Sequence, residues 1–225
     1  MFTLIASPRA DVDERELTAM SAALRSSARP VAQFREADGR AGLAAGVLGT
    51  LPEDTFDRQP LVNDDLAFVA QARLDNRDEI LQRLDVPREH WAGMADSAVL
   101  YQAYRRWGED CPQALTGDYA FAAWHRGSGK VVAAVDHLAT ARLYFAQLGT
   151  TLVLSTQLGA MLSHPGLPKD LDLSALGLFV MPRIEQGTTP YKNVHQLQGG
   201  HVLTWRGDAP VRISAGKKLH GVLTR

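Results

Sequence analysis

Two pairs of apolar segments are each joined by a tight glycine-containing turn, and this pattern limits the possible folds more than any other feature. The first pair is residues 119–125 and 130–136, separated by Gly127-Ser128-Gly129; the second is residues 142–147 and 151–155, separated by Gly149 and Thr150. Such short turns connect antiparallel neighbours. Because helical patterns are grouped between these hairpins, the sequence predicts an α+β fold and not a doubly wound parallel sheet.

Apolar periodicity predicts the remaining elements. Further strands are expected at Phe2–Ala6, Leu43–Gly49, Leu66–Leu74 and His201–Trp205, and helices at Val12–Ser26, Asn76–Leu84, Ser97–Trp107, Gln157–Ser163 and Ser174–Val180. Composition predicts loops at Leu51–Leu61 and Met181–Tyr191. We expect one domain over residues 1–205. Residues 206–225 hold five Lys or Arg and one Asp, which favours a solvated basic tail over an edge that contacts another domain.

Charge and cysteine content exclude several classes of function. The net charge is −1, from 24 basic and 25 acidic residues, so no global field attracts nucleic acid or an anionic membrane. Neither a signal peptide nor a membrane span is recognisable, and we expect a soluble, cytoplasmic chain. The only cysteine, Cys111, lies in a turn beside Glu109 and Asp110, which would raise its pKa. The seven histidines show no metal-binding spacing.

One helix has well-marked limits. Val99, Ala103 and Trp107 belong to an apolar stripe at the helical period. Gly108 follows as a C-terminal stop, and Asp96 precedes the first turn, where its carboxylate could accept free backbone N–H groups. We therefore interpret Asp96 as an N-cap residue.

Several longer motifs resemble one protein family. The passage DSAVLYQAYRRWGEDCPQALTGDYAFAAW (residues 96–124) resembles the middle of the N-terminal glutaminase domain of asparagine synthetases, β-lactam synthetases and lasso-peptide cyclases. Residues 72–79 are similar to the family's ARLDNRDEL, residues 136–145 to R-D-x-x-G-x-R-P-L-Y, residues 152–165 to FASE-x-KALL-x-HP, and residues 187–201 to G-x-TPF-x-GV-x-x-LPPGH. Together these motifs cover residues 40 to 205 in the family's order.

The resemblance implies a four-layer αββα sandwich of the N-terminal-nucleophile (Ntn) hydrolase type. In active members of the family, an N-terminal cysteine attacks the glutamine amide, its own α-amine serves as the base, and donors of an oxyanion hole stabilise the intermediate. Here the nucleophile position is occupied by Phe2, which has no nucleophilic atom. Thr3 could replace it only if both preceding residues were removed, and its β-branched side chain is already explained by a strand.

The substrate-binding positions of the family are also altered. The oxyanion-hole Asn and Gly fall on Gln71 and Ala72, and the arginine that grips the substrate carboxylate aligns near Val47. The extra methylene of Gln71 displaces the donor relative to asparagine. Asp96 matches the family aspartate that holds the glutamine α-ammonium. Its N-cap role explains it without a ligand, and we favour that role.

These observations predict a degenerate, non-catalytic glutaminase-like domain that packs against, or belongs to, an asparagine synthetase-like ATP-dependent amidoligase. The chain contains no S-G-G-x-D-S loop, so we expect ATP and Mg²⁺ only in a synthetase domain outside it, and no cofactor or metal here. The chain would then be a fragment, a truncated product or a stand-alone subunit, and a homodimer is compatible with this prediction. The alternatives are an active glutaminase with Thr3 or Cys111 as nucleophile, and an amino-acid-binding sensor.

Overall fold

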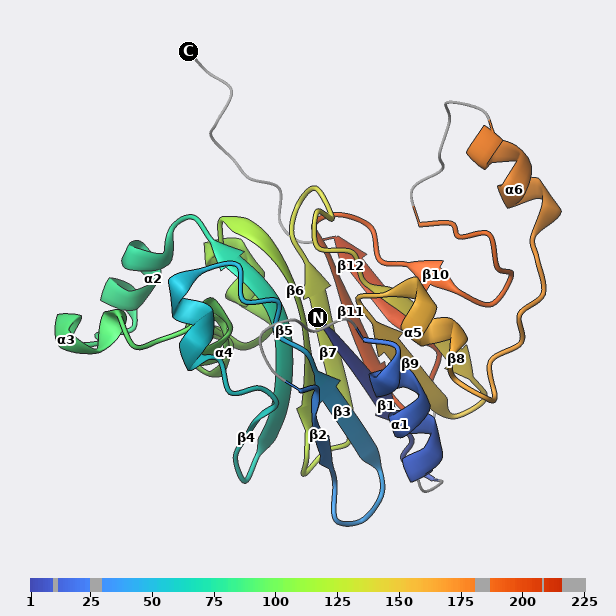
Figure 1. Cartoon of the computed structure of the whole chain (residues 1–225), viewed down its shortest axis with the longest axis horizontal. Helices are drawn as coiled ribbons and strands as arrows, with labels where there is room; N and C mark the ends of the chain where they lie inside the picture. The colour runs from blue at the N-terminus through green and yellow to red at the C-terminus, as the bar shows by residue number, and fades with distance from the viewer. Residues whose placement is uncertain (10–11, 25–29, 181–186, 208, 216–225) are drawn as a thin grey trace.

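Two six-stranded antiparallel sheets pack face to face in this computed structural model, and helices cover the outer face of each sheet (Figure 1). The structure describes residues 1–9, 12–24, 30–180, 187–207 and 209–215. The layers follow the order helix, sheet, sheet, helix. The predicted α+β class and the four-layer αββα sandwich are therefore confirmed.

The first sheet, called sheet A, has β1 near its centre. Its strand order is β10-β8-β9-β1-β3-β2. The strands are β1 (Phe2–Ala6), β2 (Ala32–Arg35), β3 (Ala41–Ala45), β8 (Tyr144–Leu148), β9 (Thr151–Ser155) and β10 (His195–Gln196). Because β1 hydrogen-bonds to both β9 and β3, the start of the chain is fixed inside the sheet.

The second sheet, called sheet B, has the order β12-β11-β7-β6-β5-β4. Its strands are β4 (Leu61–Val62), β5 (Leu66–Leu74), β6 (Gly117–His125), β7 (Lys130–Val135), β11 (His201–Arg206) and β12 (Arg212–Ala215). Gly129 and Gly149 adopt φ of 65° and 61° in the two predicted hairpin turns, conformations that glycine adopts without strain.

Helices form the two outer layers. Sheet A is covered by α1 (Glu14–Ala22) and α5 (Leu158–Leu162), and sheet B by α4 (Asp96–Trp107) with α2 (Arg77–Arg83) and α3 (Arg88–Trp91) beside it (Figure 1). Two 3₁₀ helices lie in connecting segments: η1 (Pro52–Phe56) between β3 and β4, and η2 (Gly108–Ala114) between α4 and β6. Helix α6 (Leu173–Val180) lies away from both sheets. No helix among the described residues has the length and apolar character needed to cross a bilayer.

Three apolar clusters follow from this layering. The cluster between the sheets includes Phe2, Leu4, Trp124 and Trp205. Side chains of the opposite parity on β1, such as Ile5, instead pack under α1 and α5. A third cluster lies between sheet B and α4. Strand alternation thus decides which side of sheet A each β1 residue faces.

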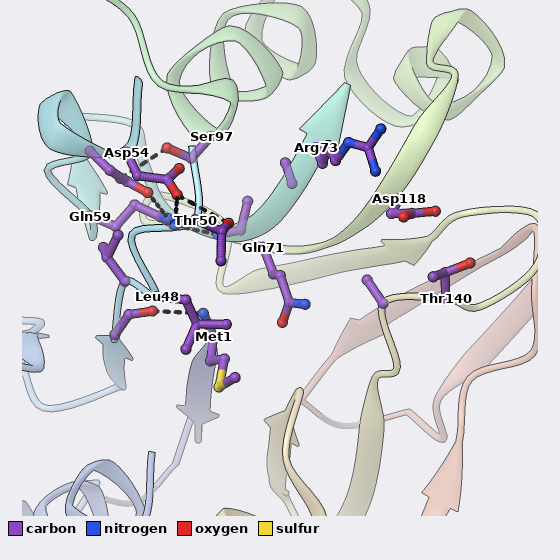
Figure 2. A pocket seen from close by; sticks show the side chains of 16 residues that line it. Met1, Leu48, Thr50, Asp54, Gln59, Gln71, Arg73, Ser97, Asp118 and Thr140 are labelled. Carbon is purple, nitrogen blue, oxygen red and sulfur yellow. Dashed lines mark hydrogen bonds between the residues drawn. The ribbon is translucent and has the colours of Figure 1, made fainter. Parts of the chain in front are cut away.

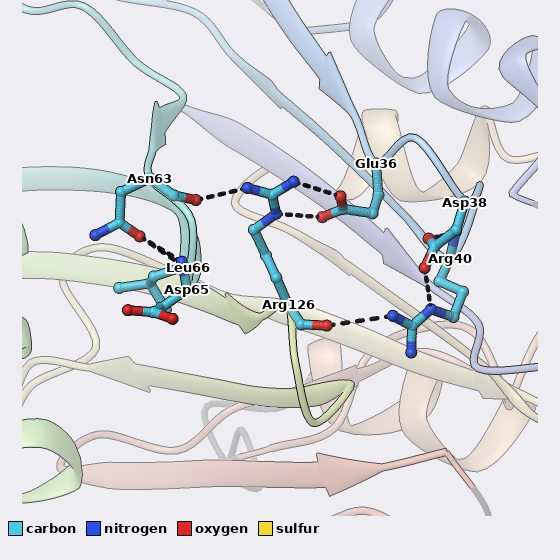
Figure 3. A network of polar contacts seen from close by, with 7 residues as sticks. All are labelled: Glu36, Asp38, Arg40, Asn63, Asp65, Leu66 and Arg126. Atoms are coloured by element: carbon cyan, nitrogen blue, oxygen red, sulfur yellow. Dashed lines mark hydrogen bonds and ion pairs between the residues drawn. The ribbon is translucent and has the colours of Figure 1, made fainter.

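A polar network joins the two sheets at the end of β1 that is remote from Met1 (Figure 3). The Arg126 guanidinium, which follows β6, donates to both carboxylate oxygens of Glu36 at 2.7 and 2.8 Å and to the Asn63 carbonyl at 2.7 Å. Hydrogen bonds from Arg126 hold the pKa of Glu36 below its ordinary value. This paired, two-pronged contact fixes the spacing of the sheets at that end.

The structure corrects the sequence prediction in several places. Strands β2, β4, β10 and β12 and helix α3 were not predicted, and η1 with part of β4 occupies the predicted loop Leu51–Leu61. Residues 212–215, predicted as part of a solvated tail, form β12 and pair with β11. These residues form a strand because the edge of β11 is free to pair with them. The composition of the segment does not indicate that such an edge lies nearby. Residues 181–186 of the other predicted loop, and 216–225 of the tail, lie outside the described residues.

Candidate functional site

A polar cavity of about 200 Å³ opens at the end of the sandwich where β1 begins (Figure 2). Segments that are far apart in sequence contribute to it: the chain start, the residues after β3, η1 and its flanks, β5, the start of α4, the start of β6 and the loop after β7. The lining residues are Met1, Gly46, Val47, Leu48, Thr50, Asp54, Asp57, Gln59, Ala70, Gln71, Ala72, Arg73, Ser97, Asp118, Thr140 and Ala141. We call this cavity the amino-terminal pocket.

The α-amine of Met1 is the most unusual group in the pocket. It donates to the Gly46 carbonyl at 2.7 Å, and the Gly46 N–H donates back to the Met1 carbonyl at 2.8 Å. Burial lowers the pKa of this amine to about 6, although the charges of Asp57 and Asp54 oppose the shift. Near neutral pH the pocket therefore contains a largely uncharged amine with a lone pair that can accept a proton.

Two of the pocket carboxylates, Asp54 and Asp57, are already engaged by neighbouring donors. Asp54 accepts the N–H groups of Thr50 and Leu51 at 2.7 and 2.9 Å. Asp57 accepts the Ser97 hydroxyl at 2.9 Å and the Gln59 amide at 3.0 Å. These bonds fix the geometry of the acidic wall, which faces the Met1 amine.

Phe2 lies at the nucleophile position but contributes nothing to the pocket surface. Its ring is fully buried in the cluster between the sheets, because even-numbered residues of β1 face that interior. Its backbone is held by β9: the Phe2 N–H donates to the Thr156 hydroxyl at 3.0 Å, and the Phe2 carbonyl accepts the Ser155 hydroxyl at 3.0 Å. An apolar ring therefore fills the place where a polar nucleophile would stand.

Neither residue considered as a substitute nucleophile faces the pocket. The Thr3 hydroxyl is fully buried under α1 and donates to the Leu154 carbonyl at 2.9 Å. Cys111 lies in η2, within the cluster between sheet B and α4, and burial raises the pKa of its thiol to about 12. A buried, protonated thiol is a poor nucleophile.

Both residues at the predicted oxyanion-hole positions line the pocket. Gln71 and Ala72 are neighbours on β5, opposite Ala120 and Tyr119 of β6. Figure 2 shows the Gln71 side chain extending into the pocket. Val47, which aligns near the family's carboxylate-binding arginine, also lines it. Three positions singled out by the motif alignment therefore line one pocket, and their roles in substrate binding stay predictions.

The N-cap interpretation of Asp96 is wrong. The helix α4 begins at Asp96 itself, Ala95 occupies the cap position, and no side-chain cap bond forms. The carboxylate instead accepts the Leu74 N–H at 2.7 Å and forms a buried ion pair with Arg77. Arg77 in turn donates to the Trp91 and Met94 carbonyls at 2.6 Å. Asp96 is only 7% exposed and is not among the pocket-lining residues, so it ties β5 and α2 to α4.

Residues of the pocket that sequence reasoning missed include Asp57, Gln59 and Ser97. Asp57 and Gln59 lie in the segment Leu51–Leu61, which was predicted as a loop. The acidic residues of that segment were the only sequence feature that could have indicated a role in the pocket. Ser97 follows Asp96 directly, yet it is Ser97 that lines the pocket. Its hydroxyl donates to the Asp57 carboxylate at 2.9 Å.

The loop after β7 supplies Thr140 and is held by one carboxylate. Asp136, 2% exposed, accepts the N–H groups of Leu138, Thr140 and Ala141 at 2.9 to 3.1 Å. Between them Ala139 adopts a φ of 51°, at the position where the family pattern R-D-x-x-G-x-R-P-L-Y has glycine. Alanine is strained in that conformation.

The described residues include no group of three or more His, Cys, Asp or Glu side chains placed to hold a metal ion. The polar groups that line the pocket are the Met1 amine, three carboxylates (Asp54, Asp57 and Asp118), three hydroxyls (Thr50, Ser97 and Thr140), two amides (Gln59 and Gln71) and the Arg73 guanidinium.

An αββα sandwich with a polar pocket at the start of a central strand is the architecture of the Ntn type. A family model described as glutamine amidotransferase domain matches residues 3–212. The chain belongs to this family and is a class II glutamine amidotransferase domain, as the motifs predicted.

Individual relatives agree with this assignment. The chain is 26% identical over 157 residues to asparagine synthetase [glutamine-hydrolyzing] 3 of Bacillus subtilis (strain 168), an alignment that covers 67% of this chain and 26% of that protein. Two solved structures have the same fold: glutamine phosphoribosylpyrophosphate amidotransferase from B. subtilis (TM-score 0.61) and an allosteric regulatory enzyme of purine biosynthesis (TM-score 0.59). Each is 14% identical and matches 96% of this chain and 49% of its own. The chain thus spans about a quarter of the synthetase and half of the solved relatives.

Proposed function

We propose that this domain does not hydrolyse glutamine and that it serves a structural role in an asparagine synthetase-like, ATP-dependent amidoligase of the β-lactam synthetase or lasso-peptide cyclase type. The observation that carries the proposal is the position of Phe2, whose ring is fully buried between the sheets. Amide formation from an amine already present in the substrate needs no ammonia, so such an enzyme can dispense with the nucleophile. ATP and Mg²⁺ would bind to the synthetase part, and a cytoplasmic location fits this role.

The hydroxyl groups of the pocket do not replace the missing thiol. Ser97 is the best placed of them, but it is nearly buried and its proton is directed at Asp57. A serine nucleophile needs a base with a pKa near neutrality, and the Met1 amine bonds to Gly46 instead. The same amine would serve as a base only for a group beside it, and Phe2 offers none.

The catalytic part of the proposal is tested with purified protein and glutamine. We expect no ammonia above the level of a protein-free blank, and no mass increase after incubation with a diazoketone analogue of glutamine. The matched comparison is the Ser97→Ala variant, which should behave identically in both assays. Ammonia release, or an adduct, that disappears in Ser97→Ala would refute the proposal and identify Ser97 as the nucleophile.

The partner is tested separately by measuring complex formation with a synthetase-like protein that carries the S-G-G-x-D-S loop and is encoded beside this chain. We expect a stable complex in size-exclusion chromatography with light scattering. Failure of every such protein to bind would refute the structural role, whereas the ammonia assay would be unaffected.

Binding of a small amino acid without hydrolysis is a second candidate function, and the persistence of the pocket favours it. About 200 Å³ remains open beside Gln71 and Arg73, below the roughly 300–1,000 Å³ typical of drug-sized ligands. A thermal-shift screen of the twenty amino acids tests this function. A shift seen with the wild type and lost in Gln71→Leu would support the sensor, and no shift with any amino acid would exclude it.

A further inference from the structure

A second cavity, separate from the amino-terminal pocket, lies at the edge of sheet B where β11 and β12 meet. Its volume is about 390 Å³, and it is lined by Glu109, Lys130, Thr204, Trp205, Arg206, Ala209, Pro210 and Arg212. It shares no lining residue with the first pocket. We call it the basic pocket.

Strand register places three cationic side chains on one face. Arg206 of β11 lies opposite Lys130 of β7, and Thr204 lies opposite Arg212 of β12. Residues 204 and 206 share their parity with Val202, which packs in the helix-side cluster, whereas Leu203 and Trp205 face the other sheet. The three cations and the threonine hydroxyl therefore project together from the outer face.

Their positive charge is only partly balanced within the described part of the chain. Lys130 forms an ion pair with Glu109 of η2. Arg206 and Arg212 are exposed, and neither has a carboxylate partner among the described residues. The positive charge also acts on His125 of β6, which lies opposite Lys130. Burial, and then the charges of Lys130 and Arg206, lower the pKa of His125. Asp208 lies outside the described residues.

The wall of the basic pocket is anchored to the rest of the domain. Gln147 of β8, in the other sheet, donates to the Ala209 carbonyl at 3.4 Å and accepts the Val211 N–H at 3.1 Å. Gly207 packs so closely on Pro8 that a Cβ at this position would lie 1.9 Å from the proline ring. Gly207, Ala209 and Val211 are thus held in place before any ligand arrives, which reduces the entropic cost of binding.

We propose that the basic pocket binds the phosphate group of a small phosphorylated ligand. Two guanidinium groups, an ammonium and a hydroxyl, delivered by three strands, supply donors for several oxygens of one tetrahedral anion. A phosphate fills only part of the cavity, and the remaining space next to Pro210 accommodates the group it is attached to. A nucleic acid is a poorer candidate because the chain as a whole carries a net charge of −1.

Inorganic phosphate and pyrophosphate, titrated at constant ionic strength, are suitable probes. Binding is followed by chemical-shift changes in a ¹H–¹⁵N spectrum of the whole chain. We expect saturable shifts at Thr204, Arg206 and Arg212, and affinity reduced about tenfold or more in the double variant Arg206→Gln/Arg212→Gln. The matched control, Arg105→Gln/Arg106→Gln, removes the same charge from the exposed side of α4 and should leave affinity within about twofold.

Both variants alter exposed side chains, and their unfolding midpoints confirm that they remain folded. A third variant, Arg206→Lys/Arg212→Lys, keeps the charge but removes the planar donors, and it should still lose several-fold in affinity. Absence of saturable shifts in the wild type would overturn the proposal. So would an equal loss in the α4 control, or unchanged binding in the lysine variant, since either result indicates unspecific attraction of anions.

Discussion

Truncating Phe2 to alanine should remove a large part of the stability of the domain. The ring is fully buried between the sheets, while the backbone bonds of Phe2 to Ser155 and Thr156 do not involve it. The substitution therefore removes the ring and leaves the strand pairing intact. Lost transfer free energy and the resulting cavity together amount to about 3–5 kcal/mol for a buried phenylalanine. Against a typical unfolding free energy of about 5–15 kcal/mol, this is a large fraction.

Urea unfolding followed by circular dichroism measures the loss. Phe56→Ala is the matched control, because Phe56 is 48% exposed in η1 and its truncation should cost at most about 1 kcal/mol. If the two variants lost similar amounts, or if Phe2→Ala lost less than about 1.5 kcal/mol, the ring would not be part of the core. The argument that an apolar residue has taken over the nucleophile position would then fail.

Three further predictions concern the groups around the pocket. Asp96→Asn removes the charged partner of the buried Arg77 and should lower the unfolding free energy by about 3 kcal/mol. The control is Asp75→Asn, in an exposed ion pair, which should change it by less than about 0.5 kcal/mol. Equal effects of the two variants in urea unfolding would contradict the burial argument. Folding lowers the pKa of the Met1 amine from 8.0 to about 6, so between these pH values the unfolded chain binds more protons than the folded one. The unfolding free energy should therefore rise from pH 6 to pH 8, by up to about 3 kcal/mol. A chain acetylated at Met1 should lack this part of the rise. Ala139→Gly relieves the positive φ and should raise the unfolding free energy by about 0.5–1 kcal/mol, and a lower melting temperature would contradict the strain.

The central strands could be predicted from the sequence, and the edge strands could not. The predicted limits of β1, β5 and β9 agree with the structure because these strands are apolar and end at clear turn signals. Strands β2 and β12 are mostly exposed and lack alternation. They are defined by the open edges of β3 and β11, which are long-range properties that no local pattern encodes.

The same distinction applies to the pocket. Gln71 and Ala72, which the motif alignment singled out, line the pocket from β5, a strand whose limits the sequence predicted. Asp96 was misread because a carboxylate before a helix is usually a cap, whereas here Arg77, 19 residues earlier in the chain, competes for it. Asp57 and Ser97 meet across 40 residues, and nothing local to either residue indicates the other.

The position of β1 explains why a phenylalanine at position 2 is compatible with an intact fold. A polar residue at position 2 would have to keep water or hydrogen-bond partners at the boundary of the core between the sheets, and active sites commonly sacrifice stability for such groups. Phenylalanine removes that cost, since its ring joins Leu4 and Trp124 in the core. The contacts of Asp96 with Arg77 and of Asp136 with the loop before β8 stabilise the same fold. Because these contacts depend on the fold and not on glutamine, stability alone accounts for them.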